Sequence, residues 1–418
     1  MDVTAWLDHQ LRLHPKNIEM GLERVRPVAE ALGVLQPAAR VLTVAGTNGK
    51  GSTVAMLEAA CLAAGLRCGA YTSPHIERYH ERIRIDGREV SDAALIAAFE
   101  AVEAARTVIP LTFFEFGTLA ALWLFTRAAL DVAVLEVGLG GRLDAVNLVD
   151  ADIALLTTVD LDHMDWLGPT REHIGREKAG VFRSGRPALI GEREPPVSVL
   201  QHAQQIGARL ERRGLDFDVE ANAESLSYRD AQGALRLPYP RLSAPAQLDN
   251  AALATRALRL LGLPEAAIAA GIANAAPRAR LQRIAGAPEI VLDVGHNPQA
   301  ARQLAQWLDA HPKPTVAVFA ALADKDIDGV VAPLRHAIAH WHLAGLEVAG
   351  RSQSAAALAA RMKAAAPDAR LHPHIDVDAA LRAALAEASP DMRVLVFGSF
   401  HTVGEAFAAL RQLGRLPA

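Results

Sequence analysis

The segment best suited to chemistry is 46–52, which reads Gly-Thr-Asn-Gly-Lys-Gly-Ser. It lies between the apolar run 41–45 and an Ala- and Leu-rich stretch, a pattern that predicts a strand, a glycine loop and a helix reaching about Ala64. Backbone N–H groups of such a loop can close around phosphate oxygens, and Lys50 could reach the β and γ phosphates. An ordinary glycine turn is the alternative. We predict phosphate binding by Gly46, Thr47, Asn48, Gly49, Lys50, Gly51 and Ser52.

Glu136 is the second candidate, because it lies near the end of the apolar run 131–137, just before a glycine-rich loop. Open α/β sheets bind ligands at the carboxyl ends of their strands. Mg²⁺ prefers oxygen ligands, so Glu136 could hold it while Arg142 and Asp144 line the loop. A capping or salt-bridged glutamate beside a structural turn would explain the same pattern.

His163 and Lys178 follow the next apolar run, 153–157. Taken alone, a single histidine is usually a satisfied polar residue, and a helical lysine is usually a solvated charge. Lys178 comes fifteen residues after His163, so one loop and one helix could return it to the same strand edge. The spacing permits this arrangement without requiring it.

Polar residues also follow apolar runs in the last third of the chain. Asp293 and His296 come at the end of the run 290–293, and Pro298 would open the next helix. Residues placed in this way could bind a nucleotide across an interdomain cleft. An Asn-Pro turn with a helix cap is the alternative explanation. The same pattern of polar residues recurs in 321–326 and 397–401.

His336 and His340 are four residues apart on an expected helix. A zinc site would need at least a third ligand, and none is evident. We interpret both as surface histidines and assign them no role.

Around these residues, apolar runs typical of strands alternate with stretches typical of helices. This alternation predicts a doubly wound, mostly parallel α/β sheet up to about residue 212, followed by a hairpin region over 213–245 and a helix from Asp249. The alternation then restarts in a smaller Rossmann-like α/β domain with strands at 290–293, 315–319 and 394–397. We expect the two domains to span 1–285 and 286–418.

Composition limits the classes of partner. The 418 residues are 51% hydrophobic and carry a net charge of −4, which offers no broad basic surface for nucleic acid or anionic membranes. Cys61 and Cys68 lie in apolar stretches, as expected for reduced thiols in a cytoplasmic protein. The amphipathic, acidic N-terminus lacks the features of a signal peptide, and no run has the length of a membrane span.

Together these motifs resemble the folylpolyglutamate synthase family, a branch of the Mur-type amide ligases. The resemblance runs in order through nearly the whole chain. Segment 112–118 is similar to the bifunctional bacterial members, which also make dihydrofolate from dihydropteroate. Six segments carry the resemblance: 46–52, 71–75, 136–144, 162–163, 176–178 and 293–298.

The resemblance implies an ATP-dependent ligase, a monomer, in which 1–285 binds ATP and the pterin and 286–418 is the glutamate-ligase domain. Its partners would be dihydropteroate or a reduced folate, L-glutamate, ATP and Mg²⁺ at two sites. The implied catalytic residues are Lys50, Glu136, His163 and Lys178. The implied metal ligands are Ser73, Glu136, His163 and Lys178, the last as a carbamylated lysine. Further nucleotide contacts fall on Asn250, Arg280, Asp293 and His296. Substrate contacts fall on Thr112, Phe114, Arg142, Asp144, Ala145, Ser399 and His401.

A monofunctional folylpolyglutamate or dihydrofolate synthase is one alternative to the bifunctional enzyme, and two less similar classes of protein are others. A cell-wall Mur ligase would carry a UDP-binding domain before the phosphate loop, and only 45 residues precede Gly46. A phosphate-loop GTPase switch would fit Asp165-Trp-Leu-Gly168, but the guanine-reading Asn-Lys-x-Asp motif is absent. The loop also departs from the strict Walker pattern, because Val44 occupies a glycine position and Gly51 separates Lys50 from Ser52.

Overall fold

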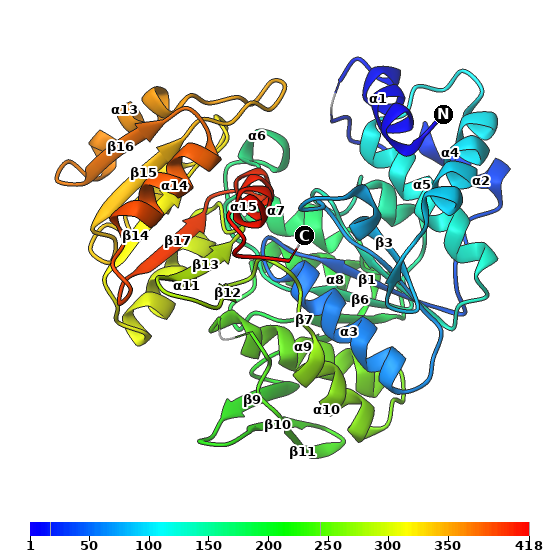
Figure 1. Cartoon of the computed structure of the whole chain (residues 1–418). Coiled ribbons are helices and arrows are strands. Elements are labelled where there is room, and N and C mark those ends of the chain that lie inside the picture. The colour runs from blue at the N-terminus through cyan, green and yellow to red at the C-terminus, as the bar shows by residue number, and fades with distance from the viewer. Residues whose placement is uncertain (17, 243, 418) are drawn as a thin grey trace. The chain divides into compact units, whose positions relative to one another are not determined.

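The computed structural model describes residues 1–16, 18–242 and 244–417. These residues form two compact units, which are described separately. The first comprises residues 1–241 and 247–276, and the second comprises residues 242–246 and 277–418. Figure 1 labels many of their elements. The expected boundary at 285 differs from this division, because the three-residue strand β12 (Gln282–Ile284) pairs with β13 (Glu289–Asp293) of the second unit.

An eight-stranded sheet in the order β4-β3-β2-β5-β1-β6-β7-β8 organises the first unit. From β2 to β8 all neighbours pair in parallel, whereas β3 and β4 form an antiparallel edge. This confirms the doubly wound, mostly parallel sheet. The strands are β1 (Arg40–Ala45), β2 (Cys68–Tyr71), β3 (Ile83–Ile85), β4 (Arg88–Glu89), β5 (Val132–Glu136), β6 (Ile153–Leu156), β7 (Pro187–Ile190) and β8 (Arg209–Arg212).

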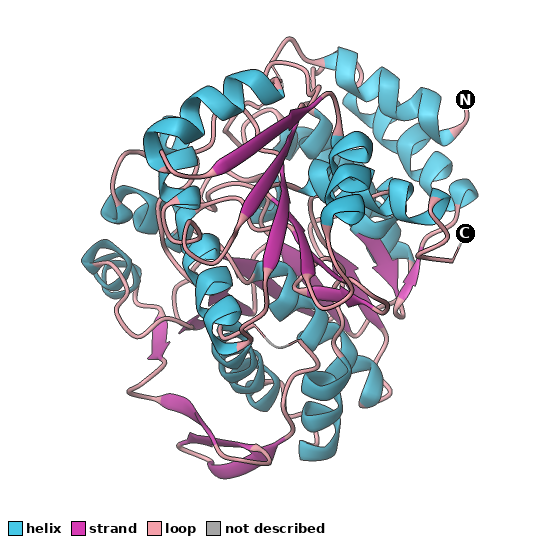
Figure 2. Cartoon of the chain, turned by 60° about the vertical axis from the view of Figure 1, so that its left-hand side comes forward, coloured by secondary structure: helices cyan, strands magenta, loops and turns pink. Residues whose placement is uncertain are grey.

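Both faces of the sheet are buried at β2, β5, β1, β6 and β7, which explains why most of these strands read as continuous apolar runs. In β1, Val41 and Ala45 belong to one core cluster, and Leu42 and Val44 belong to another. The first cluster includes residues of α1 (Val3–Leu13), α2 (Val25–Leu32), α4 (Asp92–Arg106), α5 (Phe113–Arg127), α7 (Arg171–Ala179) and α8 (Val197–Ile206). The second includes residues of α3 (Lys50–Ala63), α9 (Ala246–Leu260) and α10 (Glu265–Asn274). Figure 2 shows helices and strands in separate colours.

Local capping signals set several helix boundaries in this unit. Ser91 caps α4 by accepting from the N–H of Ala94, as the sequence predicts. The short helices are η1 (Tyr79–Arg82), η2 (Ala145–Leu148) and α6 (Met164–Leu167). The expected hairpin is a three-stranded antiparallel sheet of β9 (Phe217–Ala221), β10 (Leu226–Asp230) and β11 (Gly233–Leu237), and the helix expected from Asp249 begins at Ala246.

The second unit contains a six-stranded sheet in the order β12-β13-β17-β14-β15-β16. Only β12 is antiparallel to its neighbour among these described strands. The remaining strands are β14 (Thr315–Phe319), β15 (His340–Ala344), β16 (Arg370–His374) and β17 (Arg393–Phe397). The helices are α11 (Pro298–Ala310), α12 (Ile327–Val331), α13 (Ala355–Ala365), α14 (Val377–Glu387) and α15 (Phe400–Gln412).

The prediction that a helix carries both His336 and His340 is wrong. His336 lies in a turn, and His340 is the first residue of β15. The strand has only five residues, and so short a run carries too little periodicity to distinguish a strand from a helix. None of the described helices is long and apolar enough to cross a bilayer.

Candidate active site

Four neighbouring parallel strands of the first unit, β2, β5, β1 and β6, end at the same edge of the sheet. Ser73 follows β2, and Glu136 is the last residue of β5. The loop 46–52 follows β1, and the segment leading to His163 follows β6. Tertiary structure therefore brings together the strand-end residues that the sequence singled out in this unit.

Glycine is required twice in the loop after β1. Gly46 has φ +149°, and a Cβ there would lie 1.8 Å from Oγ1 of Thr157. Gly49 has φ +87° at the N-cap of α3, and its Cβ would lie 2.4 Å from Oδ1 of Asn250. A side chain at either position would meet a packed neighbour as well as an unfavourable backbone conformation.

Backbone groups and a hydroxyl in the segment after β6 hold this loop. The N–H of Thr47 donates to the carbonyl of Thr158 at 2.8 Å, and Oγ1 of Thr157 donates to the carbonyl of Asn48 at 2.6 Å. Oγ1 of Thr47 accepts from the N–H of Asp160 at 3.0 Å. Sequence reasoning missed Thr157 and Thr158, although two hydroxyl residues directly after an apolar run are a usable signal.

Two lysines converge on the same backbone carbonyl. Nζ of Lys50 donates to the carbonyls of Gly46 and Thr47 at 2.9 and 3.1 Å, and Nζ of Lys178 donates to that of Gly46 at 3.0 Å. Lys178 is only 5% exposed. Burial, reinforced by the positive charge of Lys50, lowers the pKa of Lys178 to about 7. In the structure, α7 thus returns Lys178 to the strand edge.

Glu136 and Ser73 meet at this edge. Glu136 is buried, and its Oε2 accepts from the N–H of Ser73 at 3.3 Å. His163 has φ +52°, and its N–H donates to Oδ1 of Asp162 at 2.9 Å. The carboxylate of Glu136 and the hydroxyl of Ser73 are oxygen ligands of the kind Mg²⁺ uses, so the donor set fits that ion. The amine of Lys178 would fit it only after conversion to a carbamate.

The glycine-rich loop after β5 packs closely against its surroundings. A Cβ on Gly138 would lie 2.6 Å from the ring of Phe114, and one on Gly141 would lie 2.8 Å from the carbonyl of Lys178. Arg142 donates to Glu177 at 2.8 Å. This loop therefore lies directly on α7, beside Lys178.

The other residues predicted to contact substrate have structural partners here. Asp144 accepts from the N–H groups of Leu139 and Val146, both at 2.9 Å, and burial raises its pKa to about 6. Thr112 caps α5 in a reciprocal pair of hydrogen bonds with Glu115. Ala145 is buried at the start of η2.

Asn250 is linked to the phosphate loop's helix through a second amide. Its Nδ2 donates to Oε1 of Gln247, and Nε2 of Gln247 donates to Oγ of Ser52, both at 3.2 Å. All three side chains are buried. The segment 247–250 thereby braces the first turn of α3.

In the second unit, the predicted residues gather at the ends of the neighbouring parallel strands β13 and β17. Asp293 accepts from the N–H groups of Leu281 and Gly295 at 2.8 and 2.7 Å, and burial raises its pKa. The His296 and Phe400 rings are 6.4 Å apart, and the Arg280 guanidinium lies 5.2 Å from the same phenyl ring. Ser399 caps α15, and His401 is exposed in its first turn.

Comparison with known proteins decides the family. Residues 44–191 match the Mur ligase middle domain, and residues 279–400 match the Mur ligase glutamate ligase domain. The dihydrofolate synthase/folylpolyglutamate synthase of Escherichia coli is 46% identical over 98% of this chain and 95% of its own length. The chain belongs to the dihydrofolate synthase/folylpolyglutamate synthase family. It is therefore an ATP-dependent ligase that forms C–N bonds.

Solved members of the dihydrofolate synthase/folylpolyglutamate synthase family have the same fold. E. coli FolC in complex with DHPP and ADP is 45% identical, with a TM-score of 0.93 and 99% of both chains covered. A bifunctional folylpolyglutamate synthase/dihydrofolate synthase with Mn, AMPPNP and L-glutamate bound is 46% identical, with a TM-score of 0.91 and 98% of both chains covered.

Proposed function

We propose that this enzyme joins L-glutamate to dihydropteroate and to reduced folates at the expense of ATP, as a monomer in the cytoplasm. One observation carries the proposal. The phosphate loop, Glu136 and Lys178 converge on one sheet edge in a chain 46% identical to a dihydrofolate synthase/folylpolyglutamate synthase.

The chemistry follows from the weakness of a carboxylate as an electrophile. A carboxylate oxygen of the acceptor attacks the γ-phosphorus of ATP, the bond to the ADP oxygen breaks, and an acyl phosphate forms. The amine of glutamate then attacks the acyl carbon, phosphate leaves, and the amine loses a proton as the amide forms. Lys50 lies in the loop where it neutralises the anions that must meet.

Mg²⁺ fits this scheme through the oxygen donors at the strand edge, and when bound it supplies charge neutralisation at the phosphates. We assign it two sites. Its proposed ligands are Ser73, Glu136, His163 and a carbamylated Lys178. The proposed additional nucleotide contacts are Asn250, Arg280, Asp293 and His296. We assign Thr112, Phe114, Arg142, Asp144 and Ala145 to the pterin, and Ser399 and His401 to glutamate.

The test is ADP release by the purified protein with Mg-ATP, with and without glutamate, using dihydropteroate and a reduced folate as separate acceptors. We expect glutamate-dependent release with both. Release with only one acceptor would replace the bifunctional assignment by a monofunctional one. Binding of ATP without release for either acceptor would contradict the proposal.

Carbamylation of Lys178 should depend on pH, because only a neutral amine attacks CO₂, forming the new C–N bond and releasing one proton. With a pKa of about 7, roughly a tenth of the Lys178 side chains are neutral at pH 6 and nine-tenths at pH 8. A carbamate resonance from carbon-13-labelled bicarbonate should therefore grow between these pH values.

The matched variants are Lys178→Gln and Lys363→Gln, since Lys363 is an exposed lysine on α13. We expect the resonance to disappear in Lys178→Gln and to persist in Lys363→Gln. A resonance of equal intensity in both variants would show that Lys178 is not the modified residue.

A further inference from the structure

Four histidines occupy alternate positions on two adjacent strands of the second unit. His340 and His342 belong to β15, and His372 and His374 belong to the neighbouring parallel strand β16. His342 pairs in register with His372. Because side chains alternate between faces along a strand, all four project from the same face of the sheet.

The opposite face of these strands carries the hydrophobic core. Trp341 and Leu343 of β15 belong to that core cluster, and Leu371 of β16 packs against it. On the histidine face, α14 contacts both strands and ends at Glu387. The histidines therefore lie between the sheet and a helix that supplies a carboxylate.

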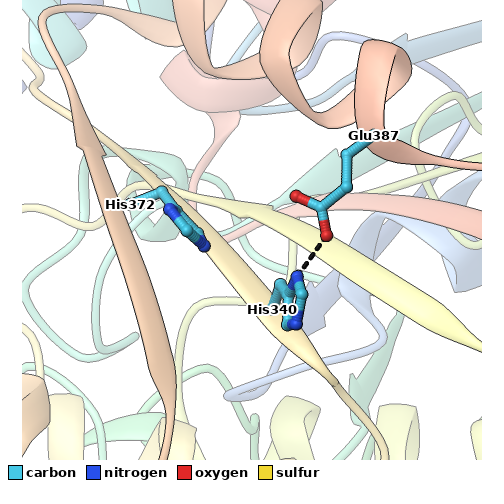
Figure 3. Close-up of side chains that lie close together, drawn as sticks. All are labelled: His340, His372 and Glu387. Carbon is cyan, nitrogen blue, oxygen red and sulfur yellow. Dashed lines mark hydrogen bonds and ion pairs between the residues drawn. The ribbon is translucent and has the colours of Figure 1, made fainter.

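Three of these side chains form a compact set of donors. The ligand atoms of His340, His372 and Glu387 all lie within 4.8 Å of one another. Figure 3 shows the three side chains together, with Glu387 hydrogen-bonded to His340. Two imidazoles and one carboxylate, with water completing the tetrahedron, form a ligand set that Zn²⁺ uses in proteins.

The other two histidines, His342 and His374, extend this set through further contacts. Nε2 of His342 lies 3.0 Å from Oε2 of Glu387, and Nδ1 of His342 lies 3.0 Å from Nε2 of His374. The His342 ring also stacks on that of His372, with centroids 5.2 Å apart. Partners that orient a ligating carboxylate or imidazole in this way are typical of metal sites.

We propose that this chain binds a divalent transition-metal ion of the zinc class at His340, His372 and Glu387. The ion joins the edge strand β16 to β15 and to the C-terminal end of α14. The nitrogen-rich ligand set distinguishes this site from the oxygen-rich one at the phosphate loop, because Mg²⁺ prefers oxygen.

Arg370 competes with the metal in this arrangement. Its Nη1 lies 3.1 Å from Nε2 of His340, so this nitrogen accepts from the guanidinium and the ring proton is on Nδ1. Metal bound at Nδ1 would require the proton on Nε2 instead. Arg370 is exposed and can turn away. Arg370→Ala should therefore bind the metal at least as tightly as the wild type.

The experiment is calorimetric titration of Zn²⁺ into the untagged, chelator-treated, full-length protein in excess Mg²⁺, which occupies sites of the magnesium type. We expect Zn²⁺ binding whose affinity falls roughly tenfold or more in His372→Ala and in Glu387→Gln. His336→Ala is the matched control, because His336 is exposed in the same unit and lies outside the cluster. It should bind as the wild type does.

Thermal denaturation gives a second readout, since an ion bound only to the folded state raises Tm. Zn²⁺ should raise the Tm of the wild type and of His336→Ala, but not that of His372→Ala. The proposal is overturned if the wild type binds no Zn²⁺, or if His372→Ala and Glu387→Gln bind it unchanged. It is also overturned if the bound Zn²⁺ is lost in His163→Ala and kept in His372→Ala.

Discussion

Lys50→Met lowers the rate of glutamate-dependent ADP formation by roughly a thousandfold at saturating substrate, about 4 kcal/mol of transition-state stabilisation. Lys50 is held in the phosphate loop by the carbonyls of Gly46 and Thr47, and methionine keeps most of its length without the charge. The loss should therefore appear in kcat, with little change in Tm. Steady-state kinetics and thermal denaturation of the variant provide the measurement.

The same substitution should also affect Lys178. The positive charge of Lys50 is one of the causes that lower the pKa of Lys178. Without that charge the pKa rises, so carbamylation in Lys50→Met should need a higher pH than in the wild type.

The control is Lys363→Met, which removes a lysine from the exposed surface of α13 and should retain full activity. If the rate of the Lys50→Met enzyme is within tenfold of the wild-type rate, Lys50 is not a catalytic residue.

Gly46→Ala should lower both the free energy of unfolding and the affinity for ATP. The new Cβ would lie 1.8 Å from Oγ1 of Thr157, at a backbone φ of +149°. Backbone strain and overpacking together predict a loss of about 3 kcal/mol. Thr157 also holds the carbonyl of Asn48, so its displacement would open the loop. Urea denaturation and nucleotide titration measure the two effects.

Gly65→Ala measures how much stability is lost when a side chain is placed at a positive φ without a steric clash. Gly65 lies just beyond the other end of α3, has φ +76°, and has nothing within 4 Å of its added Cβ. This substitution should lower the free energy of unfolding by only about 1 kcal/mol and leave ATP affinity unchanged. Adding Thr157→Ala to Gly46→Ala should recover part of the lost stability. If Gly46→Ala and Gly65→Ala lower the free energy of unfolding equally, the clash with Thr157 does not cause the lost stability.

Local sequence patterns were sufficient for much of the fold. The strand at 315–319, the cap at Ser91 and the helix opened by Pro298 match β14, α4 and α11, because each depends on neighbouring residues. The boundary at 276/277 was missed because β12 has only three residues and its pairing with β13 involves another segment. Short strands carry little periodicity of their own.

In the candidate site, too, some features follow from local sequence and others depend on distant segments of the chain. Spacing allowed Lys178 to return to the strand edge, but only tertiary structure decided that it donates to Gly46 and that burial lowers its pKa. The spacing likewise gave no indication that Gly49 must make room for Asn250. Burial and contact depend on the packing of segments far apart in the chain.

Sequence alone predicted the alternation of strands and helices, the glycine loop after β1 and the family resemblance, because these depend on local residue types and their spacing. Tertiary structure decided which strand ends meet, which glycines have no room for a side chain, and that His340 joins His372 and Glu387. Spacing alone gives no role to His340, because its partners come from other segments of the chain, His372 from the paired strand β16 and Glu387 from α14.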